Sequence, residues 1–400
     1  MKFKRFPMNK EVQSHQQTQM VKRSALQDML VEASRPGVLS FALGLPAPEL
    51  FPTSEYARAI DHVLSTKTQA LQYGPPFQPL KEQITKLMTL RGVECKPEQV
   101  FLTSGAQQGI SLLAQLLLHS GRQVIVEELA YTGFQQVLES YEPEIISVPT
   151  NIETGMEVDV VQRLLEQGAR PAFIYTVTDG HNPLAVSMSN VKRIHLMEVA
   201  KRYCVPIIED DPYGFIYYHD KLNPPLRAID DQWVFYVGSF SKILAPALRV
   251  GWIIAPEAYI THLPNIKEAS DINTSTLNQY AISHYLDSGH LTTHLQTLRD
   301  EYRIRRDAML SALDRHFPRA SRWHKPTSGI FIWVELPKGI DTVEALKISL
   351  ETERIAFIPG QAFCVNNDCQ ASHCMRLNFS NSSVAGIEDG IPRLARVLTR

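Results

Sequence analysis

The chain has 400 residues, 44% of them hydrophobic, which is enough apolar sequence for one large domain or two to three smaller ones. Its 40 Lys and Arg residues are nearly balanced by 42 Asp and Glu residues, and the net charge of −2 gives no reason to expect nucleic acid or an anionic membrane as a partner. Small molecules are therefore the expected ligands.

The beginning of the chain, MKFKRFPMNKEVQSHQQTQMVKRS, has basic residues but no apolar core of signal-peptide length, and no later window approaches about 18 uninterrupted apolar residues. Five cysteines without a CxxC pair favour a reducing compartment over a disulfide framework. We therefore expect a cytoplasmic protein.

A helix is expected over 24–33, and the N-terminal part as a whole carries too little apolar sequence to form a domain. From about residue 98, short apolar runs alternate with segments of helical length. The runs are QVFLTSG, RQVIVEE, PAFIYTVTDG, VPIIEDD, WVFYVGSFSK and RVGWIIAP. This alternation predicts a mostly parallel sheet covered by helices.

The pattern changes after residue 290. HLQTLRDEYRIRRDAMLSALDRHF is typical of a long amphipathic helix, and GIFIWVELP of a strand, so a smaller α+β unit is expected there. Cys364, Cys369 and Cys374, with His373, form a cluster in a polar, loop-like stretch. Nothing in that stretch favours convergence of the side chains on one ion, so we expect free thiols and no metal site.

Polar residues follow the apolar runs, at the strand ends where open parallel sheets bind ligands. The turn Ser104–Gly105–Ala106–Gln107 opens a helix, and its backbone N–H groups suit a phosphate, although ordinary helix capping uses the same residues. Ser239 and Arg249 favour the phosphate, because they add a hydroxyl donor and a planar cation. Lys242 ends another run, where a lysine is paired, shifted in pKa or engaged as an imine unless it reaches solvent.

Pyridoxal phosphate would use this whole set, because it carries an aldehyde, a phosphate, a phenolic oxygen and a ring nitrogen that must stay protonated. Lys242 would bind the aldehyde, and Asp210 would pair with the ring nitrogen. Asn182 and Tyr213 would hydrogen-bond the phenolic oxygen, and Tyr131 would stack on the ring. The phosphate would be bound by Ser239, Ser241 and Arg249.

The motifs DDPYG, HNP and GSFSK, with an arginine seven residues after the lysine, resemble the class I/II aminotransferases of fold type I. Further matching stretches cover nearly the whole chain: GLPAPELFP, LQYG, TSGAQQG, AYTGF, YRIRRDAML, SGIFIWVELP and MRLNFS. The pattern is most similar to the branch of α-aminoadipate and kynurenine aminotransferases and the aminotransferase-like domains of MocR regulators.

The resemblance implies an α/β fold with a mostly parallel seven-stranded sheet between helices. It implies an N-terminal segment, 1–48, that packs with the small domain and covers the active site, a large pyridoxal-phosphate-binding domain, 49–290, and a small C-terminal domain, 291–400. It also implies a homodimer with shared active sites, in which Tyr73 reaches the phosphate bound by the neighbouring subunit.

The resemblance further implies that Lys242 is the catalytic lysine, linked to pyridoxal 5'-phosphate as a Schiff base. The substrate is expected to contact Arg376, which would grip its α-carboxylate, together with Asn182 and Gly44. The implied cofactor-binding residues are Gly105, Ala106, Gln107, Tyr131, Asn182, Asp210, Tyr213, Ser239, Ser241, Lys242, Arg249 and Tyr73.

Two stretches depart from the family pattern. The family usually has Asn-Pro-Thr-Gly, whereas this chain has Asn182-Pro183-Leu184-Ala185, so the turn lacks its glycine and is expected to bend differently. The stretch GPPFQPLKEQI after Tyr73 is shorter than usual and lacks a common glycine.

The implied reaction is a ping-pong transamination between an L-amino acid and a 2-oxo acid, in which the amine of Lys242 also moves the Cα proton. A lyase, decarboxylase or synthase would use much the same residues. A regulator that senses the cofactor would need a winged-helix domain, for which a pattern beginning by about residue 20 leaves no room. Aromatic, branched and 2-aminoadipate-like donors all remain open.

Overall fold

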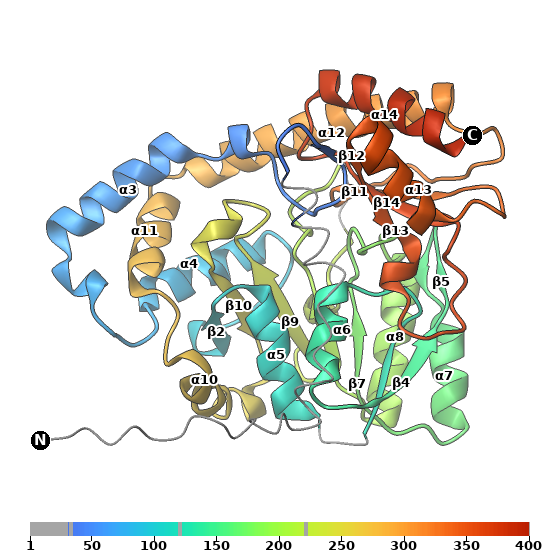
Figure 1. Cartoon of the computed structure of the whole chain (residues 1–400). Helices are drawn as coiled ribbons and strands as arrows, with labels where there is room; N and C mark the ends of the chain where they lie inside the picture. Colours follow the sequence, from blue (N-terminus) through green and yellow to red (C-terminus); the bar gives the residue numbers. More distant parts are fainter. Residues whose placement is uncertain (1–30, 32–34, 119–121, 220–222, 400) are drawn as a thin grey trace, which may run out of the picture.

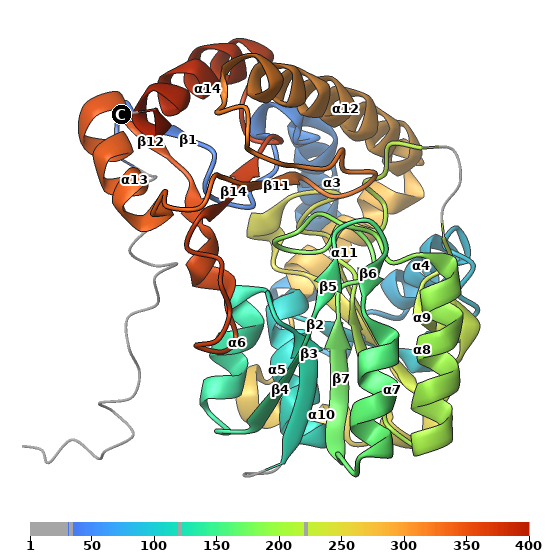
Figure 2. The same ribbon diagram turned by 90° about the vertical axis from the view of Figure 1, so that its right-hand side faces the viewer.

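The computed structural model describes residues 31, 35–118, 122–219 and 223–399. Its centre is a seven-stranded sheet (Figures 1 and 2), and all of its neighbouring strands are parallel except those that flank β10. In spatial order the strands are β2 (Val100–Thr103), β10 (Gly251–Ile254), β9 (Val234–Ser239), β8 (Ile207–Asp210), β7 (Pro171–Thr176), β3 (Gln123–Glu127) and β4 (Glu144–Val148). The predicted fold is therefore confirmed. The edge strand β4 was not among the predicted apolar runs.

Helices cover both faces of this sheet, which explains why its strands are continuously apolar rather than alternating. Successive residues of β3 show the two faces: Val124 and Val126 pack in one hydrophobic cluster, and Ile125 packs in another. Figure 2 shows the helices on either side. One side carries α5 (Ala106–Leu117), α6 (Thr132–Glu139) and α10 (Leu263–Asp271), and the other carries α7 (Val158–Glu166) and α8 (Asn190–Tyr203).

Further helices lie at the β2 end of the sheet and beside it (Figure 1). They are α3 (Thr53–Thr66), α4 (Gln78–Thr89) and α11 (Thr276–Asp287). The short helix α9 (Leu226–Ile229) packs instead against α8 and β9. A short hairpin pairs β5 (Thr150–Asn151) with β6 (Gly155–Met156). Only Val31 of the helix predicted over 24–33 falls within the described residues.

The C-terminal third forms a smaller α+β assembly that lies above the large sheet in Figure 2. Its sheet joins β11 (Phe331–Glu335), β14 (Cys374–Asn378) and β13 (Ile358–Pro359), beside α12 (His290–His316), α13 (Thr342–Ile348) and α14 (Val384–Leu398). The predicted long helix and the strand at GIFIWVELP are both present. The N-terminal β1 (Leu39–Ser40) pairs in parallel with β12 (Ile355–Ala356). The division at residues 48 and 290 stays a prediction.

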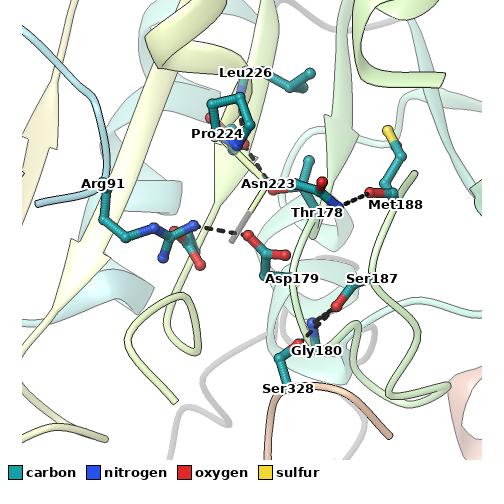
Figure 3. A network of polar contacts seen from close by, with 12 residues as sticks. Arg91, Thr178, Asp179, Gly180, Ser187, Met188, Asn223, Pro224, Leu226 and Ser328 are labelled. Atoms are coloured by element: carbon teal, nitrogen blue, oxygen red, sulfur yellow. Dashed lines mark hydrogen bonds and ion pairs between the residues drawn. The ribbon is translucent and has the colours of Figure 1, made fainter. Parts of the chain in front are cut away.

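A buried network of charged side chains fixes the loop that follows β7. The guanidinium of Arg91 contacts Asp179 at 2.8 Å, as Figure 3 shows, and Asp211 at 3.1 Å. Arg193 contacts the other oxygen of Asp179 at 2.7 Å and also donates to the carbonyl oxygen of Thr178. Because buried charges are stable only when paired, this network holds the loop in one arrangement, and the same loop carries Asn182.

Cys364 and Cys369 form a disulfide bond, which corrects the expectation of free thiols at these two positions. The 3₁₀ helix Gly360–Phe363 and the turn after it bring the two Cα atoms to 5.6 Å, a separation that a disulfide can bridge. Cys374 is free and buried. Among the described residues, no group of His, Cys, Asp and Glu could hold a metal ion.

Within the described parts of the chain, no helix combines the length and the apolar character needed to cross a membrane.

Candidate active site

A cavity of about 280 Å³ lies at the carboxyl ends of the parallel strands, where the sequence predicted ligand binding. The predicted site residues in its lining are Gly44, Ala106, Gln107, Tyr131, Asn182, Asp210, Tyr213, Ser239, Ser241, Lys242, Arg249 and Arg376. Gly105 and Tyr73 are the predicted residues outside the lining. Residues from the N-terminal segment, five strand ends and the C-terminal β14 therefore meet in one cavity.

Lys242 follows β9 and extends into this cavity. Its Nζ donates a hydrogen bond to the carbonyl oxygen of Gly44 at 2.7 Å, so it contacts the N-terminal segment directly. Burial lowers the pKa of Lys242 to about 8, and the positive charges of Arg376 and Arg249 act in the same direction, whereas Asp210 opposes them. An appreciable fraction of this amine is therefore uncharged and nucleophilic near neutral pH.

Asp210 ends β8 and is buried beside the cavity. One carboxyl oxygen, Oδ2, accepts a hydrogen bond from the hydroxyl of Tyr175 at 2.8 Å, whereas Oδ1 has no partner. Burial raises the pKa of Asp210 to about 7, and the hydrogen bond from Tyr175 opposes this rise. A buried carboxyl with a free oxygen facing a cavity fits the protonated ring nitrogen of pyridoxal phosphate.

Arg376 lies on β14, the central strand of the small sheet. Its Nη1 donates to Oδ1 of Asn182 at 2.5 Å and its Nη2 donates to the carbonyl oxygen of Ala42 at 2.7 Å, whereas its buried Nε has no partner. The guanidinium carbon lies 4.0 Å from the ring centre of Phe331 and 4.8 Å from that of Phe363. Burial lowers the pKa of Arg376 to about 10, so the group stays cationic at neutral pH. The unpartnered Nε suits a carboxylate.

The residues at the start of α5 suit a phosphate. Gly105 precedes α5 with a φ of 91°, and a Cβ there would lie 2.6 Å from Nη2 of Arg249, so only glycine lets this arginine approach the helix start. Helix geometry leaves the N–H groups of Ala106 and Gln107 without partners inside the helix. Ser239 and Ser241, 2.9 Å apart at their hydroxyl oxygens, line the same cavity.

Two tyrosines line the cavity, Tyr213 buried and Tyr131 half-buried. Burial raises the pKa of both Tyr131 and Tyr213, so each keeps its phenolic proton and can donate it in a hydrogen bond. Gly133 makes room for Tyr131, because a Cβ there would lie 2.5 Å from the tyrosine ring and equally close to the side chain of Gln107. The cavity lining that contains Lys242 therefore also offers two flat rings and two hydroxyl donors.

The turn that lacks the family glycine is buried beside the site. Ala185 has a φ of 57°, in the left-handed region that favours glycine, and its N–H donates to the carbonyl oxygen of His181. The ring of the same histidine contacts Glu127, whose carboxylate oxygen lies 3.4 Å from His181 Nε2. The side-chain oxygen of Asn182 accepts a hydrogen bond from Arg376, whereas a contact with the phenolic oxygen of the cofactor would use the amide nitrogen of Asn182.

Tyr73 is 74% exposed and lines a separate hollow with Pro75 and Ile272. Its role at the phosphate bound by the neighbouring subunit stays a prediction. Tyr175 was missed, because it lies inside an apolar run and no local pattern distinguishes its hydroxyl from those of ordinary core tyrosines.

Comparison with known proteins agrees with this geometry. The family described as "Aminotransferase class I and II" matches residues 44–394. Aromatic-amino-acid aminotransferase 1 of Thermococcus litoralis is 36% identical over 387 residues, which cover 94% of this chain and 92% of that protein.

Two solved structures have nearly the same fold. Kynurenine aminotransferase of Pyrococcus horikoshii, in complex with PMP, has a TM-score of 0.90 at 33% identity and 97% coverage of both chains. The α-aminoadipate aminotransferase of Thermus thermophilus, complexed with N-(5'-phosphopyridoxyl)-L-leucine, has a TM-score of 0.89 at 32% identity, covering 96% of this chain and 97% of that one. The chain therefore belongs to the class I and II aminotransferases, the fold type I enzymes that use pyridoxal phosphate to exchange amino groups between amino acids and 2-oxo acids.

Proposed function

We propose that the cavity around Lys242 is the catalytic site of this aminotransferase. One observation carries the proposal: three groups with complementary chemistry share the cavity lining. They are the Lys242 amine with its lowered pKa, the free carboxyl oxygen of Asp210 and the free Nε of Arg376. These are the groups needed to hold an aldehyde, a protonated ring nitrogen and a substrate carboxylate.

Asp210, Arg376 and Lys242 have different roles in the proposed reaction. Bound pyridoxal phosphate supplies an electron-withdrawing ring that stabilises negative charge at the substrate Cα. Asp210 holds the proton on the ring nitrogen, and Arg376 orients the amino acid through its α-carboxylate. Lys242 Nζ holds the aldehyde end until an amino acid replaces it. The freed Nζ would then move the proton from Cα to the carbon that carried the aldehyde, a task for which a pKa of about 8 is well suited.

The remaining contacts orient the cofactor. Tyr213 and Asn182 donate to its phenolic oxygen, and Tyr131 stacks on its ring. The phosphate is bound by Gly105, Ala106, Gln107, Ser239, Ser241 and Arg249. Gly44 lies over the substrate, and its carbonyl oxygen fixes the resting position of Lys242. We also propose that the protein is cytoplasmic, as its composition suggests.

The cavity favours amino donors with an apolar or aromatic side chain. After Asp210, Lys242, Arg249 and Arg376 are given their roles, the described lining residues offer no further cation for a second substrate carboxylate. The uncommitted lining is largely apolar: Leu43, Leu45, Ile110, Val177 and Phe331. Two of the relatives are named for aromatic amino acids and kynurenine, and the Thermus enzyme was solved with a leucine adduct.

A spectroscopic titration tests both the reaction and the donor class. The purified holoenzyme is mixed with phenylalanine, leucine, glutamate or 2-aminoadipate without any oxo acid. With phenylalanine and leucine, we expect the cofactor band to shift to shorter wavelength, and an added 2-oxo acid to restore it. The second-order rate constants should exceed that of 2-aminoadipate by about tenfold or more.

A preference for 2-aminoadipate would reject the proposed donor class. If ammonia or carbon dioxide accumulates and the cofactor band shows no reversible shift, the proposed roles of these residues in transamination are rejected.

We further propose a homodimer in which Tyr73 completes the site of its partner subunit. Tyr73 is exposed outside its own cavity, Leu71 beside it is 71% exposed, and both belong to the arm after α3 that forms one edge of the molecule in Figure 1. Large exposed apolar residues on a projecting arm are typical of an interface.

Mixed dimers provide the test of this arrangement. Tyr73→Ala and Lys242→Ala chains, each poorly active alone, are unfolded together and refolded in equal amounts. Half of the dimers should be hybrids with one intact site each, so about a quarter of wild-type activity should return. If the mixture is no more active than the sum of its parents, Tyr73 does not act across the interface.

A further inference from the structure

Two buried tyrosine–aspartate pairs lie side by side at the end of β8. The hydroxyl of Tyr175 on β7 donates to Asp210 at 2.8 Å, and the hydroxyl of Tyr236 on β9 donates to Asp211 at 2.9 Å. Because β8 lies between these strands and consecutive residues point in opposite directions, the two pairs are separate. Only Asp210 lines the cavity.

The two carboxyl groups differ in their remaining contacts. Asp211 lies 3.1 Å from the guanidinium of Arg91, which balances its charge. Within the described residues Asp210 has no arginine partner, and Tyr175 gives it the hydrogen bond to Oδ2. The other oxygen, Oδ1, is buried without a partner, so it is the oxygen available to a bound group.

Tyr175 is itself held rigidly. Its ring is almost completely buried and stacks on that of Phe134 with the ring centres 3.6 Å apart and the planes 4° from parallel. Its hydroxyl therefore occupies a fixed point, and a carboxyl bonded to it cannot turn about its own axis without losing that bond.

The hydrogen bond also acts on the charge of the carboxyl. Burial and the neighbouring Asp211 both raise the pKa of Asp210, and a hydroxyl donor stabilises the ionised form against them. An ionised Asp210 is the form that stabilises a protonated ring nitrogen.

We propose that Tyr175 is a positioning residue, whose hydroxyl holds Oδ2 of Asp210 so that the ionised carboxylate presents Oδ1 to the ring nitrogen of bound pyridoxal phosphate. This inference rests on the role proposed above for Asp210. It assigns to Tyr175 no contact with the cofactor itself. Its effect should therefore appear only in properties that depend on the ring nitrogen.

The test compares how apoprotein binds two ligands, pyridoxal phosphate and an analogue in which carbon replaces the ring nitrogen. The ratio of their Kd values measures the ring-nitrogen contact, because aldehyde and phosphate are common to both. Tyr175→Phe keeps the stacked ring and removes the hydroxyl. We expect it to reduce the preference for the natural cofactor by about tenfold, the effect of one hydrogen bond to a charged group.

Tyr236→Phe is the matched control, since it removes the same hydroxyl from the neighbouring pair. Its ratio of the two Kd values should equal that of the wild type, because Asp211 lies outside the cavity lining. A general loss of packing would weaken both ligands equally and would leave the ratio unchanged. Thermal unfolding of each apoprotein confirms that the variants are folded.

Asp210→Asn separates failure of the inference from failure of the proposed site. If this variant keeps the wild-type ratio, Asp210 does not bind the ring nitrogen. If it loses the preference while Tyr175→Phe keeps it, the role of Asp210 stands and Tyr175 is not its positioning residue. Should Tyr175→Phe not fold, Tyr175→His and Tyr175→Leu decide, because only histidine can donate. Equal ratios in these two would overturn the inference.

Discussion

Replacing Lys242 with alanine should lower kcat for transamination by about ten-thousandfold, the upper range for loss of a positioned acid–base group. The loss combines two functions, because the same Nζ holds the cofactor aldehyde and moves the Cα proton. The described lining of the cavity contains no second amine that could replace it. Steady-state turnover of phenylalanine with a 2-oxo acid measures the effect.

Lys192→Ala is the matched control. Its Nζ also donates to a glycine carbonyl oxygen, that of Gly155 at 3.0 Å, but it lies outside the cavity lining. This variant should keep wild-type kcat. If Lys242→Ala retains a substantial part of the activity, the proposed catalytic role is wrong.

The pH dependence of cofactor binding by the wild-type apoprotein is a second test of Lys242. Only the uncharged amine attacks an aldehyde, and the pKa of Lys242 is lowered from 10.5 to about 8. The rate of cofactor capture should therefore rise with pH up to about 8 and level off above it. A rise that continues to pH 10 would show an ordinary exposed lysine.

Replacing Arg376 with lysine should lower kcat/KM for amino acid donors by about a thousandfold, within the range for a buried charged contact. Lysine keeps the positive charge but not the planar fork, so it cannot contact Asn182, Ala42 and a substrate carboxylate together. Affinity for pyridoxal phosphate should change little, because Arg376 is not assigned to the cofactor. Kinetics with phenylalanine and with phenethylamine, which lacks the carboxylate, measure the effect.

The loss should be confined to phenylalanine, since phenethylamine offers nothing to Arg376. Arg305→Lys is the control: this arginine is similarly buried and donates to the carbonyl oxygen of Ser380 at 2.6 Å, but it lies outside the cavity lining. Equal losses for both amines in Arg376→Lys would mean that the substitution damages the site generally rather than the carboxylate contact.

Local sequence patterns were sufficient for the strand ends and for half of the residues that line the cavity. A polar residue directly after an apolar run, such as Asp210 or Ser239, must lie at a strand end, and parallel strands bring those ends together. The family resemblance then supplied Arg376 and Gly44, whose positions depend on contacts with distant parts of the chain. The Arg376 and Asn182 side chains, for example, meet across 194 residues.

Other features had no local signal. The hydroxyl of Tyr175 is hidden in a continuously apolar strand, and its importance depends on which neighbour lies opposite it. The disulfide between Cys364 and Cys369 depends on a turn that the polar sequence of that stretch did not specify. Ala185 adopts a backbone conformation that its side chain disfavours, so packing around the turn must outweigh local preference there.

The contact between Arg376 and Ala42 has a consequence for the order in which the protein acquires its function during synthesis. These residues are 334 positions apart, and β1 joins β12 over a similar interval. A ribosome-bound chain contains Lys242 long before it contains Arg376, so the reactive amine precedes the group that anchors the substrate. Nascent chains therefore cannot carry a complete site until β14 has been translated.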